Sequence, residues 1–300
     1  MPDVLVIPVN YRAASATEKF LRSAARLEGF TRVHFLVVDN NSGDGSAEEL
    51  RSSVSSYPNV ELLESTSNRG YFGGANWALQ NYLRRRHRPD WVVVSNHDIT
   101  FNDPKFFTRL LQRDPASAAV LAPTIISSQT GIDSNPFLRR RPSEWQLRWY
   151  RFWLSHYSLM WCKQLLSPFV RRLRQAGRRP SEHGDCSHIY APHGSFLIFS
   201  RSYFEAGGCI DDGFFLYAEE FSVAEICRRL GLQIVHERSL RVFHDAHHAT
   251  GRLCNRAMFD EGRKGLEYAL RNYFFPRPGV EFHPSQRNDA AASLQGGSRP

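Results

Sequence analysis

The stretch FLVVDNNSGDGSAEEL, residues 35–50, decides the fold because a hydrophobic run stops at a carboxylate and a polar turn follows at once. Residues 35–38 read as a buried strand, Asp39 ends it, and the next seven residues are all Asn, Ser, Gly or Asp. Open α/β sheets bind ligands at the carboxyl ends of their strands, and the same residue types also cap helices. The turn is therefore either a helix cap or half of a pocket.

Strand-like and helix-like segments alternate on both sides of this stretch. Continuous Val, Ile and Leu runs are typical of a parallel sheet that helices cover on both faces, so the sequence predicts an α/β fold. The expected strands are residues 4–9, 33–38, 60–64 and 91–95, with helices near 17–27, after Ser46 and near 74–86. A second α/β run should hold a strand and a short helix within 189–208, a helix from Glu219, and a pair of strands within 233–245.

The positive charge of the chain is concentrated in one segment. The 300 residues are 42% hydrophobic, enough for one large domain or two smaller ones, and carry a formal charge of +8. Residues 137–180 hold eleven Lys or Arg and a single acid, Glu144. The rest of the chain is slightly acidic, so the basic character belongs to this segment.

The cysteines and the N-terminus indicate a cytoplasmic protein. The five cysteines are an odd number and form no C-x-x-C pair, which fits neither a disulfide framework nor a thiolate metal site. The chain passes from Met1 straight into a strand-like run, and no apolar run approaches the roughly 20 residues that span a bilayer.

Four polar clusters lie where strands are expected to end. They are residues 39–44, 68–76, 96–98, and Glu219-Glu220 with His244. The glycines of the second cluster precede a helix, so they either cradle a phosphate or allow close packing. A carboxylate at the end of the third suits a hard divalent cation that bridges a diphosphate. Adjacent carboxylates raise one another's pKa, as a general base requires, but they also complement a helix dipole.

Seven motifs in order carry a resemblance to a known family. VIPVNY, VVDNNSGDGS, NRGYFGGAN, SNHDI, GSFLIF, FFLYAEE and VFH resemble the inverting family-2 glycosyltransferases, most of all the rhamnosyltransferase-like branch that builds bacterial surface polysaccharides. The similarity covers about residues 4–248 apart from the basic segment. It implies a GT-A fold, with a Rossmann-like mixed sheet flanked by helices. It also implies a UDP- or dTDP-linked sugar donor, possibly dTDP-rhamnose, and a glycan or lipid-linked acceptor.

The resemblance also implies roles for individual residues. Glu220 would be the catalytic base, Asp98 and His244 would bind Mg²⁺ or Mn²⁺, and Gly194 and Glu219 would lie on the acceptor side. Asp39 would accept a hydrogen bond from the N3–H that uracil and thymine share. The residues expected to bind the nucleotide are Pro8, Asn10, Asp39, Asn41, Asn68, Gly70, Gly73, Gly74, Asn76, Asn96 and His97.

Two departures from the family pattern affect the site. The metal motif reads Asn96-His97-Asp98, which leaves one formal charge to hold the cation, and Glu220 stands where Asp is usual. Three alternatives stay open: a nucleotidyltransferase, an inactive transferase, and a protein whose Arg-rich segment binds nucleic acid. The transferase interpretation expects no nucleic-acid partner, and the sequence leaves the oligomeric state undetermined.

We expect four parts along the chain. Residues 1–136 would bind the nucleotide-sugar, residues 137–185 would form a basic aromatic helical insertion, residues 186–283 would carry the acceptor and catalytic half, and residues 284–300 would be a disordered tail.

The insertion holds four of the six tryptophans. Read as a helix from about Ser143, it places Trp145, Trp149, Trp153, Tyr157 and Trp161 on one broad side, and Glu144, Arg148, Arg151 and Ser155 on the other. The helix either packs its aromatic side on the catalytic domain or docks on an anionic membrane surface. The second alternative predicts a peripheral enzyme on the inner face of the membrane.

Overall fold

The computed structural model describes residues 3–159, 186–245 and 256–276. The strands are β1 (Val4–Asn10), β2 (Val33–Asp39), β3 (Val60–Glu64), β4 (Trp91–Asn96), β5 (Ile99–Thr100), β6 (Val120–Ser127), β7 (Cys186–Ile189), β8 (Phe196–Ser200) and β9 (Ile234–His244). The α-helices are α1 (Ala14–Ala24), α2 (Ser46–Val54), α3 (Tyr71–Leu83), α4 (Phe106–Leu111), α5 (Glu144–Trp153), α7 (Arg201–Glu205), α8 (Glu219–Arg229) and α9 (Arg256–Ala269). A 3₁₀ turn, η1 (Phe30–Arg32), precedes β2, and a π-helical turn, η2 (Leu270–Phe274), continues α9.

The strands form one mixed sheet. Its order is β3-β2-β1-β4-β8-β6-β9-β5, with β7 paired to β9. The four strands β1 to β4 are parallel, whereas β8 is antiparallel to both β4 and β6. Val9 is in register with Val38 and with Asn96, so β1, β2 and β4 end at the same edge of the sheet.

The pairing of β4 with β8 joins the two predicted halves in this one sheet, and the division of the chain at residues 136 and 185 stays a prediction. The predicted tail, residues 284–300, lies outside the described residues.

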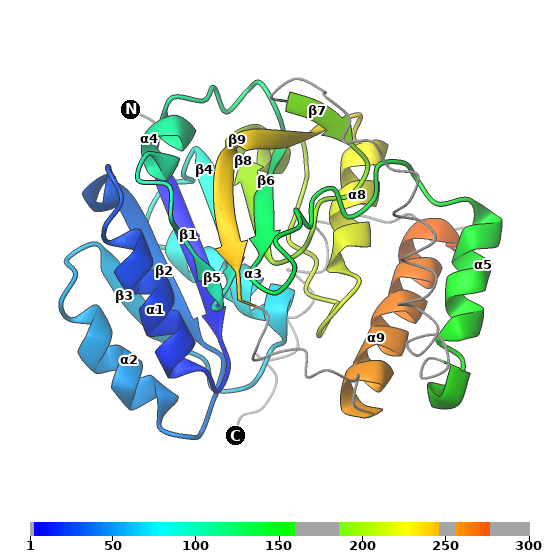
Figure 1. Cartoon of the computed structure of the whole chain (residues 1–300), viewed down its shortest axis with the longest axis horizontal. Coiled ribbons are helices and arrows are strands. Elements are labelled where there is room, and N and C mark those ends of the chain that lie inside the picture. Colours follow the sequence, from blue (N-terminus) through cyan, green and yellow to red (C-terminus); the bar gives the residue numbers. More distant parts are fainter. Residues whose placement is uncertain (1–2, 160–185, 246–255, 277–300) are drawn as a thin grey trace, which may run out of the picture.

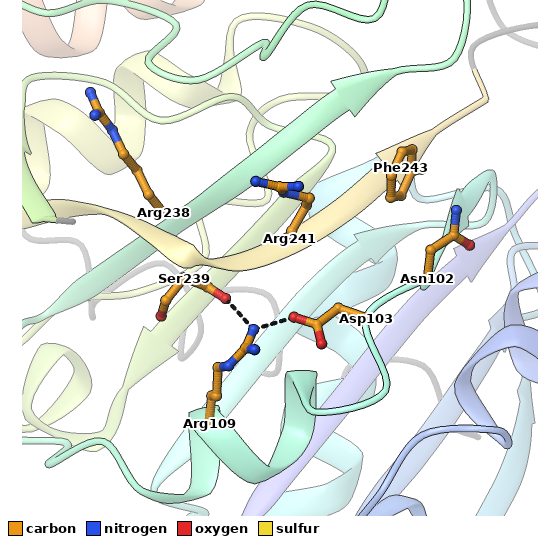
Figure 2. A pocket seen from close by; sticks show the side chains of 7 residues that line it. All are labelled: Asn102, Asp103, Arg109, Arg238, Ser239, Arg241 and Phe243. Atoms are coloured by element: carbon orange, nitrogen blue, oxygen red, sulfur yellow. Dashed lines mark hydrogen bonds and ion pairs between the residues drawn. The ribbon is translucent and has the colours of Figure 1, made fainter. Parts of the chain in front are cut away.

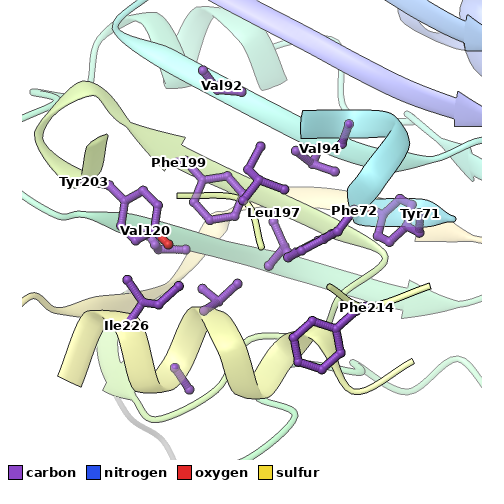
Figure 3. Packing of buried hydrophobic residues seen from close by; sticks show 14 of the residues in the cluster. Tyr71, Phe72, Val92, Val94, Val120, Leu197, Phe199, Tyr203, Phe214 and Ile226 are labelled. Carbon is purple, nitrogen blue, oxygen red and sulfur yellow. The ribbon is translucent and has the colours of Figure 1, made fainter. Parts of the chain in front are cut away.

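Helices cover both faces of the sheet, as the continuous apolar strands predicted. One core contains Phe20 of α1, Leu50 of α2 and Phe106 of α4. The other contains side chains of α3, α7, α8 and α9 packed on the strands (Figure 3). In that view Ile226 of α8 faces the strand residues Val120, Leu197 and Phe199. Each large apolar side chain that is fully buried in this way contributes about 1.5–3 kcal/mol to folding.

The predicted pair of strands within 233–245 is wrong, because this segment is the single strand β9. The register against β6 moves from Pro123 opposite Glu237 to Thr124 opposite Arg241. Ser239 donates both its backbone N–H and its hydroxyl to Glu237 Oε1, which satisfies polar groups inside the irregularity. Polar residues that resemble a turn in the sequence therefore form a bulge.

Helix α5 begins where the sequence predicted. Ser143 caps it and forms a reciprocal capping box with Gln146. The helix ends at Trp153, where Ser155 Oγ donates to Phe152 C=O, so a single helix running on to residue 161 is wrong. Residues 157–159 are helical again, and Trp161 lies outside the described residues.

The aromatic side of α5 is only partly buried. Leu147 is buried, and Tyr150 packs on the same core. Trp145 is 69% exposed, Trp149 44% and Phe152 51%. Figure 1 shows α5 beside α9, at the end of the molecule farthest from α1 and α2. Within the described ranges, no helix has both the length and the apolar character needed to cross a bilayer.

Candidate active site

Side chains at the ends of β2 and β1 form a hydrogen-bond network. Asp39 is buried, and its Oδ1 accepts hydrogen bonds from Asn10 Nδ2 at 2.8 Å and from the Ser42 hydroxyl at 2.5 Å. The Ser42 backbone N–H donates to Asp39 Oδ2 at 3.1 Å. The N-cap of α2 is Gly45, which makes no side-chain capping bond, but Asp44 Oδ1 accepts from the Ser46 backbone N–H at 3.1 Å, so the turn also satisfies the start of α2. Asn41 lies in it with φ of +59°.

Asn40 belongs to the turn after Asp39 but was not among the residues predicted to bind the nucleotide. Its buried amide donates from Nδ2 to Asn68 Oδ1 at 3.0 Å and to Gly70 C=O at 2.8 Å. Its Oδ1 accepts from the Arg69 backbone N–H at 3.0 Å. Asn40 therefore ties the turn after β2 to the glycine loop before α3. The two adjacent asparagines at 40–41 are the feature of the sequence that could have indicated this role.

The glycine loop has packing reasons of its own. Gly70 has φ of +73°, and a Cβ there would lie 2.1 Å from the carbonyl oxygen of Phe215. A Cβ at Gly74 would lie 3.2 Å from Val9 Cγ1, and one at Gly73 would lie 3.1 Å from Arg69 Cβ. Close backbone approach thus accounts for Gly70, and phosphate binding by the three glycines stays a prediction.

The other residues predicted to bind the nucleotide lie around this edge. Pro8 pairs with Ser95 along β1 and β4, and Asn96 ends β4. His97 turns back toward β1, with Nδ1 3.2 Å from the Val9 carbonyl oxygen. Asn76 lies farther along α3 and donates to Asp212 Oδ2 at 3.2 Å. Their predicted contacts with a nucleotide remain predictions.

The structure brings Asp98 and His244 together from strands far apart in the sequence. His244 Nε2 lies 3.2 Å from Asp98 Oδ1, and Asp98 is 4% exposed. Within the described residues no hydrogen-bond donor reaches either Asp98 oxygen. A buried carboxylate without donors is costly, so these two side chains suit a divalent cation that completes the site.

The described ranges contain no cluster of three potential metal-binding side chains. Such a cation would therefore take further ligands from substrate phosphates or water.

His193 adjoins this pair and was also missed. Its ring centroid lies 5.9 Å from that of His244, and its Nδ1 accepts from the Ser195 backbone N–H at 3.2 Å. Burial, followed by the charge of His244, lowers the pKa of His193 to about 4. The imidazole is thus neutral at neutral pH. The signal was its position directly before Gly194 in the motif PHGSF.

Glu219 and Glu220 begin α8, and both carboxylates lie close to Gly194. The Gly194 backbone N–H donates to Glu220 Oε1 at 3.2 Å, whereas no described donor reaches Glu219 Oε2. Burial raises the pKa of both carboxyls, and the charge of Glu220 raises the pKa of Glu219 further. The hydrogen bond from Gly194 favours the ionised form of Glu220, so Glu220 is the better candidate for a general base.

Tyr71 links the two parts of the site. Its hydroxyl donates to the Gly194 carbonyl oxygen at 2.9 Å. Burial, then the charges of Glu219, Asp98 and Glu220, raises the pKa of Tyr71 well above its usual value, as expected where three carboxylates surround one phenol. The metal-binding candidates and the two carboxylates therefore share one site.

Residues 211–218, which precede the two carboxylates, contain strained backbone and are held by contacts with α9 and η2. Tyr217 and Ala218 both have positive φ, of +68° and +69°. Such backbone conformations of residues other than glycine cluster at functional sites. A Cβ at Gly265 of α9 would lie 2.4 Å from the Tyr217 carbonyl oxygen. Asp211, at the start of the segment, accepts hydrogen bonds from Tyr268 and Tyr273. No motif in the sequence indicated these contacts.

We expect Gly194→Ala to cost activity without unfolding the protein. A Cβ there would lie 2.7 Å from Glu219 Oε1 and 3.0 Å from Glu220 Oε1, so both carboxylates must move. A displacement of about 1 Å in a catalytic group costs about 10²-fold in rate. Transfer rate and melting temperature are the measurements. Gly262→Ala, whose Cβ would make only an ordinary 3.9 Å contact, is the control, and equal activity of the two variants would contradict the assignment.

A separate basic pocket of about 580 Å³ lies over β9 (Figure 2). Arg109 donates to the Ser239 carbonyl oxygen and pairs with Asp103, while Arg238 and Arg241 extend from β9. None of the predicted site residues lines it.

The chain is similar in sequence to known proteins. The model of the family "Glycosyl transferase family 2" matches residues 5–206. N-acetylglucosaminyl-diphospho-decaprenol L-rhamnosyltransferase of Mycobacterium tuberculosis is 30% identical over 267 residues, which are 84% of this chain and 79% of the relative. The low-salt glycan biosynthesis hexosyltransferase Agl10 of Haloferax volcanii is 25% identical over 238 residues, which are 78% of this chain and 64% of the relative.

Two solved structures share the fold. The mannosyltransferase PcManGT of Pyrobaculum calidifontis, in complex with GDP-Man and Mn²⁺, is similar with a TM-score of 0.50 at 15% identity, over 98% of this chain and 82% of that one. GalNAc-T7 with UDP, GalNAc and Mn²⁺ has a TM-score of 0.57 at 13% identity, over 92% of this chain and 51% of that one. Both are GT-A glycosyltransferases, which confirms the predicted fold. Because the family model covers more than half of the chain, the protein belongs to glycosyl transferase family 2.

Proposed function

We propose that the protein transfers a sugar from a UDP- or dTDP-linked donor to a hydroxyl of a glycan or lipid-linked acceptor, with inversion. The observation that carries the proposal is the set of linked contacts around Tyr71 and Gly194. Asp98 pairs with His244, Gly194 donates to Glu220 and accepts from Tyr71, and the charges of Glu219, Asp98 and Glu220 all raise the pKa of Tyr71. The printed name of the Mycobacterium relative supports rhamnose as the sugar and a lipid diphosphate in the acceptor.

We propose that the base of the donor binds at Asp39. The Asp39 Oδ2 atom accepts one hydrogen bond, from the Ser42 backbone N–H, and a carboxylate oxygen can accept two. The free lone pair suits the N3–H of uracil or thymine. Asn10, which is fully buried, fixes the orientation of the carboxylate.

The reaction is a single displacement. The acceptor oxygen bonds to the anomeric carbon, the bond from that carbon to the diphosphate oxygen breaks, and Glu220 takes the proton of the acceptor hydroxyl. The Gly194 N–H positions the Glu220 carboxylate, while burial and the charge of Glu220 raise the pKa of Glu219 and so favour its protonated form. Mg²⁺ or Mn²⁺, held by Asp98 and His244, would supply positive charge for the departing diphosphate.

Hydrolysis of a panel of nucleotide-sugars by the purified protein tests the proposal. The panel contains UDP- and dTDP-sugars, including dTDP-rhamnose, each with Mn²⁺, Mg²⁺ or EDTA. Release of nucleoside diphosphate with at least one donor, and its loss in EDTA, is expected. Release of pyrophosphate would instead indicate a nucleotidyltransferase, and inertness toward every donor would contradict the proposal.

We further propose that α5 holds the enzyme on an anionic membrane. Trp145 and Trp149 stack at 5.6 Å between ring centroids and Phe152 adjoins them, so the exposed rings form one aromatic surface. Arg148 and Arg151 of the same helix are also exposed. Aromatic rings at headgroup depth beside arginines are typical of interfacial helices.

Sedimentation with vesicles checks the membrane proposal. The protein should bind phosphatidylglycerol vesicles and bind phosphatidylcholine vesicles much less, because each nearby cation contributes about 1 kcal/mol on an anionic surface. Changing Trp145, Trp149 and Phe152 together to Ser should release it. Ile132→Ser removes an exposed apolar side chain outside α5 and is the control. Negligible binding to both lipids would show that α5 only packs on the domain.

A further inference from the structure

A large cleft lies between α5, the segment 213–215 and the α9–η2 helix. Its volume is about 1000 Å³, and its lining includes Arg148, Arg151, Phe215, Lys264, Arg271 and Phe275. Cations and aromatic rings therefore line the same hollow, beside the aromatic surface of α5.

The charges in the cleft are not fully balanced. Lys264 pairs with Glu261 at 2.7 Å, Arg148 pairs with Glu144 at 2.8 Å, and Glu267, the other acid in the lining, pairs with Arg263 at 3.3 Å.

Arg151 and Arg271 are exposed, and neither forms an ion pair with another residue in the described part of the chain. Two arginines on facing elements are thus free to bind an anion, and guanidinium groups match phosphate oxygens in pairs.

The apolar part of the lining is exposed as well. Phe215 is 46% exposed and Phe275 42%, although both are large aromatic side chains. An anion alone leaves these rings in water. A ligand that joins a phosphate group to a hydrocarbon chain would cover both the charges and the rings.

The segment 213–218 links the cleft to the candidate active site. The Phe215 carbonyl oxygen accepts from the Tyr71 backbone N–H at 2.9 Å, and Tyr71 in turn donates to Gly194. Residues 213–218 lead from the cleft into Glu219 and Glu220, at the start of α8. A ligand in the cleft therefore lies one short segment away from the general base.

We propose that this cleft binds the diphosphate and the first hydrocarbon units of a prenyl-diphosphate-linked acceptor, which places the acceptor sugar toward Glu220. Arg151 and Arg271 pair with the phosphate oxygens, and Phe215 and Phe275 contact the hydrocarbon. The assignment rests on the proposed transferase function. The donor diphosphate is a different ligand, since its proposed site is at Asp98 and His244.

Calorimetric titration of the full-length protein with farnesyl diphosphate tests the assignment. Mn²⁺ and saturating UDP or dTDP are present, so that the donor site is filled. Farnesyl diphosphate should bind more tightly than farnesol and than inorganic pyrophosphate, because only the first supplies both the charge and the hydrocarbon.

Arginine variants locate the binding site. The double variant R151Q/R271Q should weaken binding by at least about tenfold, because charge-assisted hydrogen bonds to the phosphate oxygens are lost. R26Q/R84Q, which removes two exposed arginines outside the cleft lining, should leave binding within about twofold of the wild type. R151K/R271K, which keeps the charge, should bind better than the glutamine variant.

The outcomes separate this inference from the transferase function. Unchanged binding in R151Q/R271Q, or equal affinity for pyrophosphate alone, overturns the cleft assignment even if the protein hydrolyses a nucleotide-sugar. The expected binding pattern without hydrolysis of any donor keeps the cleft and overturns the transferase function. Equal losses in R26Q/R84Q and R151Q/R271Q would show a non-specific charge effect and also overturn the assignment.

Discussion

Glu220→Gln should lower the rate of sugar transfer by about 10²- to 10⁴-fold, the usual cost of removing a general base. The amide keeps the shape of the side chain but cannot take the proton of the acceptor hydroxyl. Donor affinity should stay near that of the wild type, because the predicted nucleotide residues lie at the ends of β1, β2 and β4. Transfer rate and donor affinity, measured on the same preparation, test both statements.

Glu219→Gln is the matched control. Burial and the neighbouring charge raise the pKa of Glu219 well above its usual value, which favours its uncharged form, and Gln is also uncharged. We expect this variant to keep most of its activity. An inactive Glu219→Gln beside an active Glu220→Gln would reverse the roles of the two carboxylates.

The pH dependence follows from the same geometry. A general base works only when it is ionised, and burial raises the pKa of Glu220. Activity should therefore fall as the pH drops through this raised pKa, which lies above the value of about 4.3 for an unperturbed glutamate. The protonated form, present below that pKa, is inactive.

Asp98→Ala should abolish transfer together with metal-dependent donor binding. In the structure Asp98 is 4% exposed. Its oxygens accept no hydrogen bond from a described residue, so the substitution removes no hydrogen bond and only the contact with His244. The variant should therefore melt close to the wild-type temperature when metal is absent.

Thermal melting with and without Mn²⁺ and nucleotide measures this effect. The wild type should be stabilised by the two together, and Asp98→Ala should not, because a ligand stabilises only a protein that binds it. Asp103→Ala removes a nearby carboxylate that pairs with Arg109, and it should keep the ligand effect. Full activity in Asp98→Ala would remove this residue from the mechanism.

The sequence by itself determined β1 to β4 and β8, the helices α1, α2, α3, α5, α7 and α8, and the edge of the sheet at which the candidate site lies. It did not indicate β5, β6, β7 or α9. Runs such as residues 91–94 and 35–38 are continuously apolar, which is typical of a strand buried on both faces. The order of polar motifs at the strand ends was sufficient for the resemblance to identify the family. The motif FFLYAEE likewise placed Glu219 and Glu220 at the start of a helix.

The tertiary structure alone decided which of these residues meet. Asp98 and His244 are brought to 3.2 Å by the pairing of β5 with β9 and by the bulge in β9, and neither feature leaves a local period in the sequence. The close contact of Gly70 with Phe215 is equally non-local. In α5 the spacing of the apolar residues predicted one broad aromatic side. Which of its rings are buried depends on the elements that pack against α5. Local patterns report the geometry of one element, whereas these contacts depend on how elements far apart in the chain pack together.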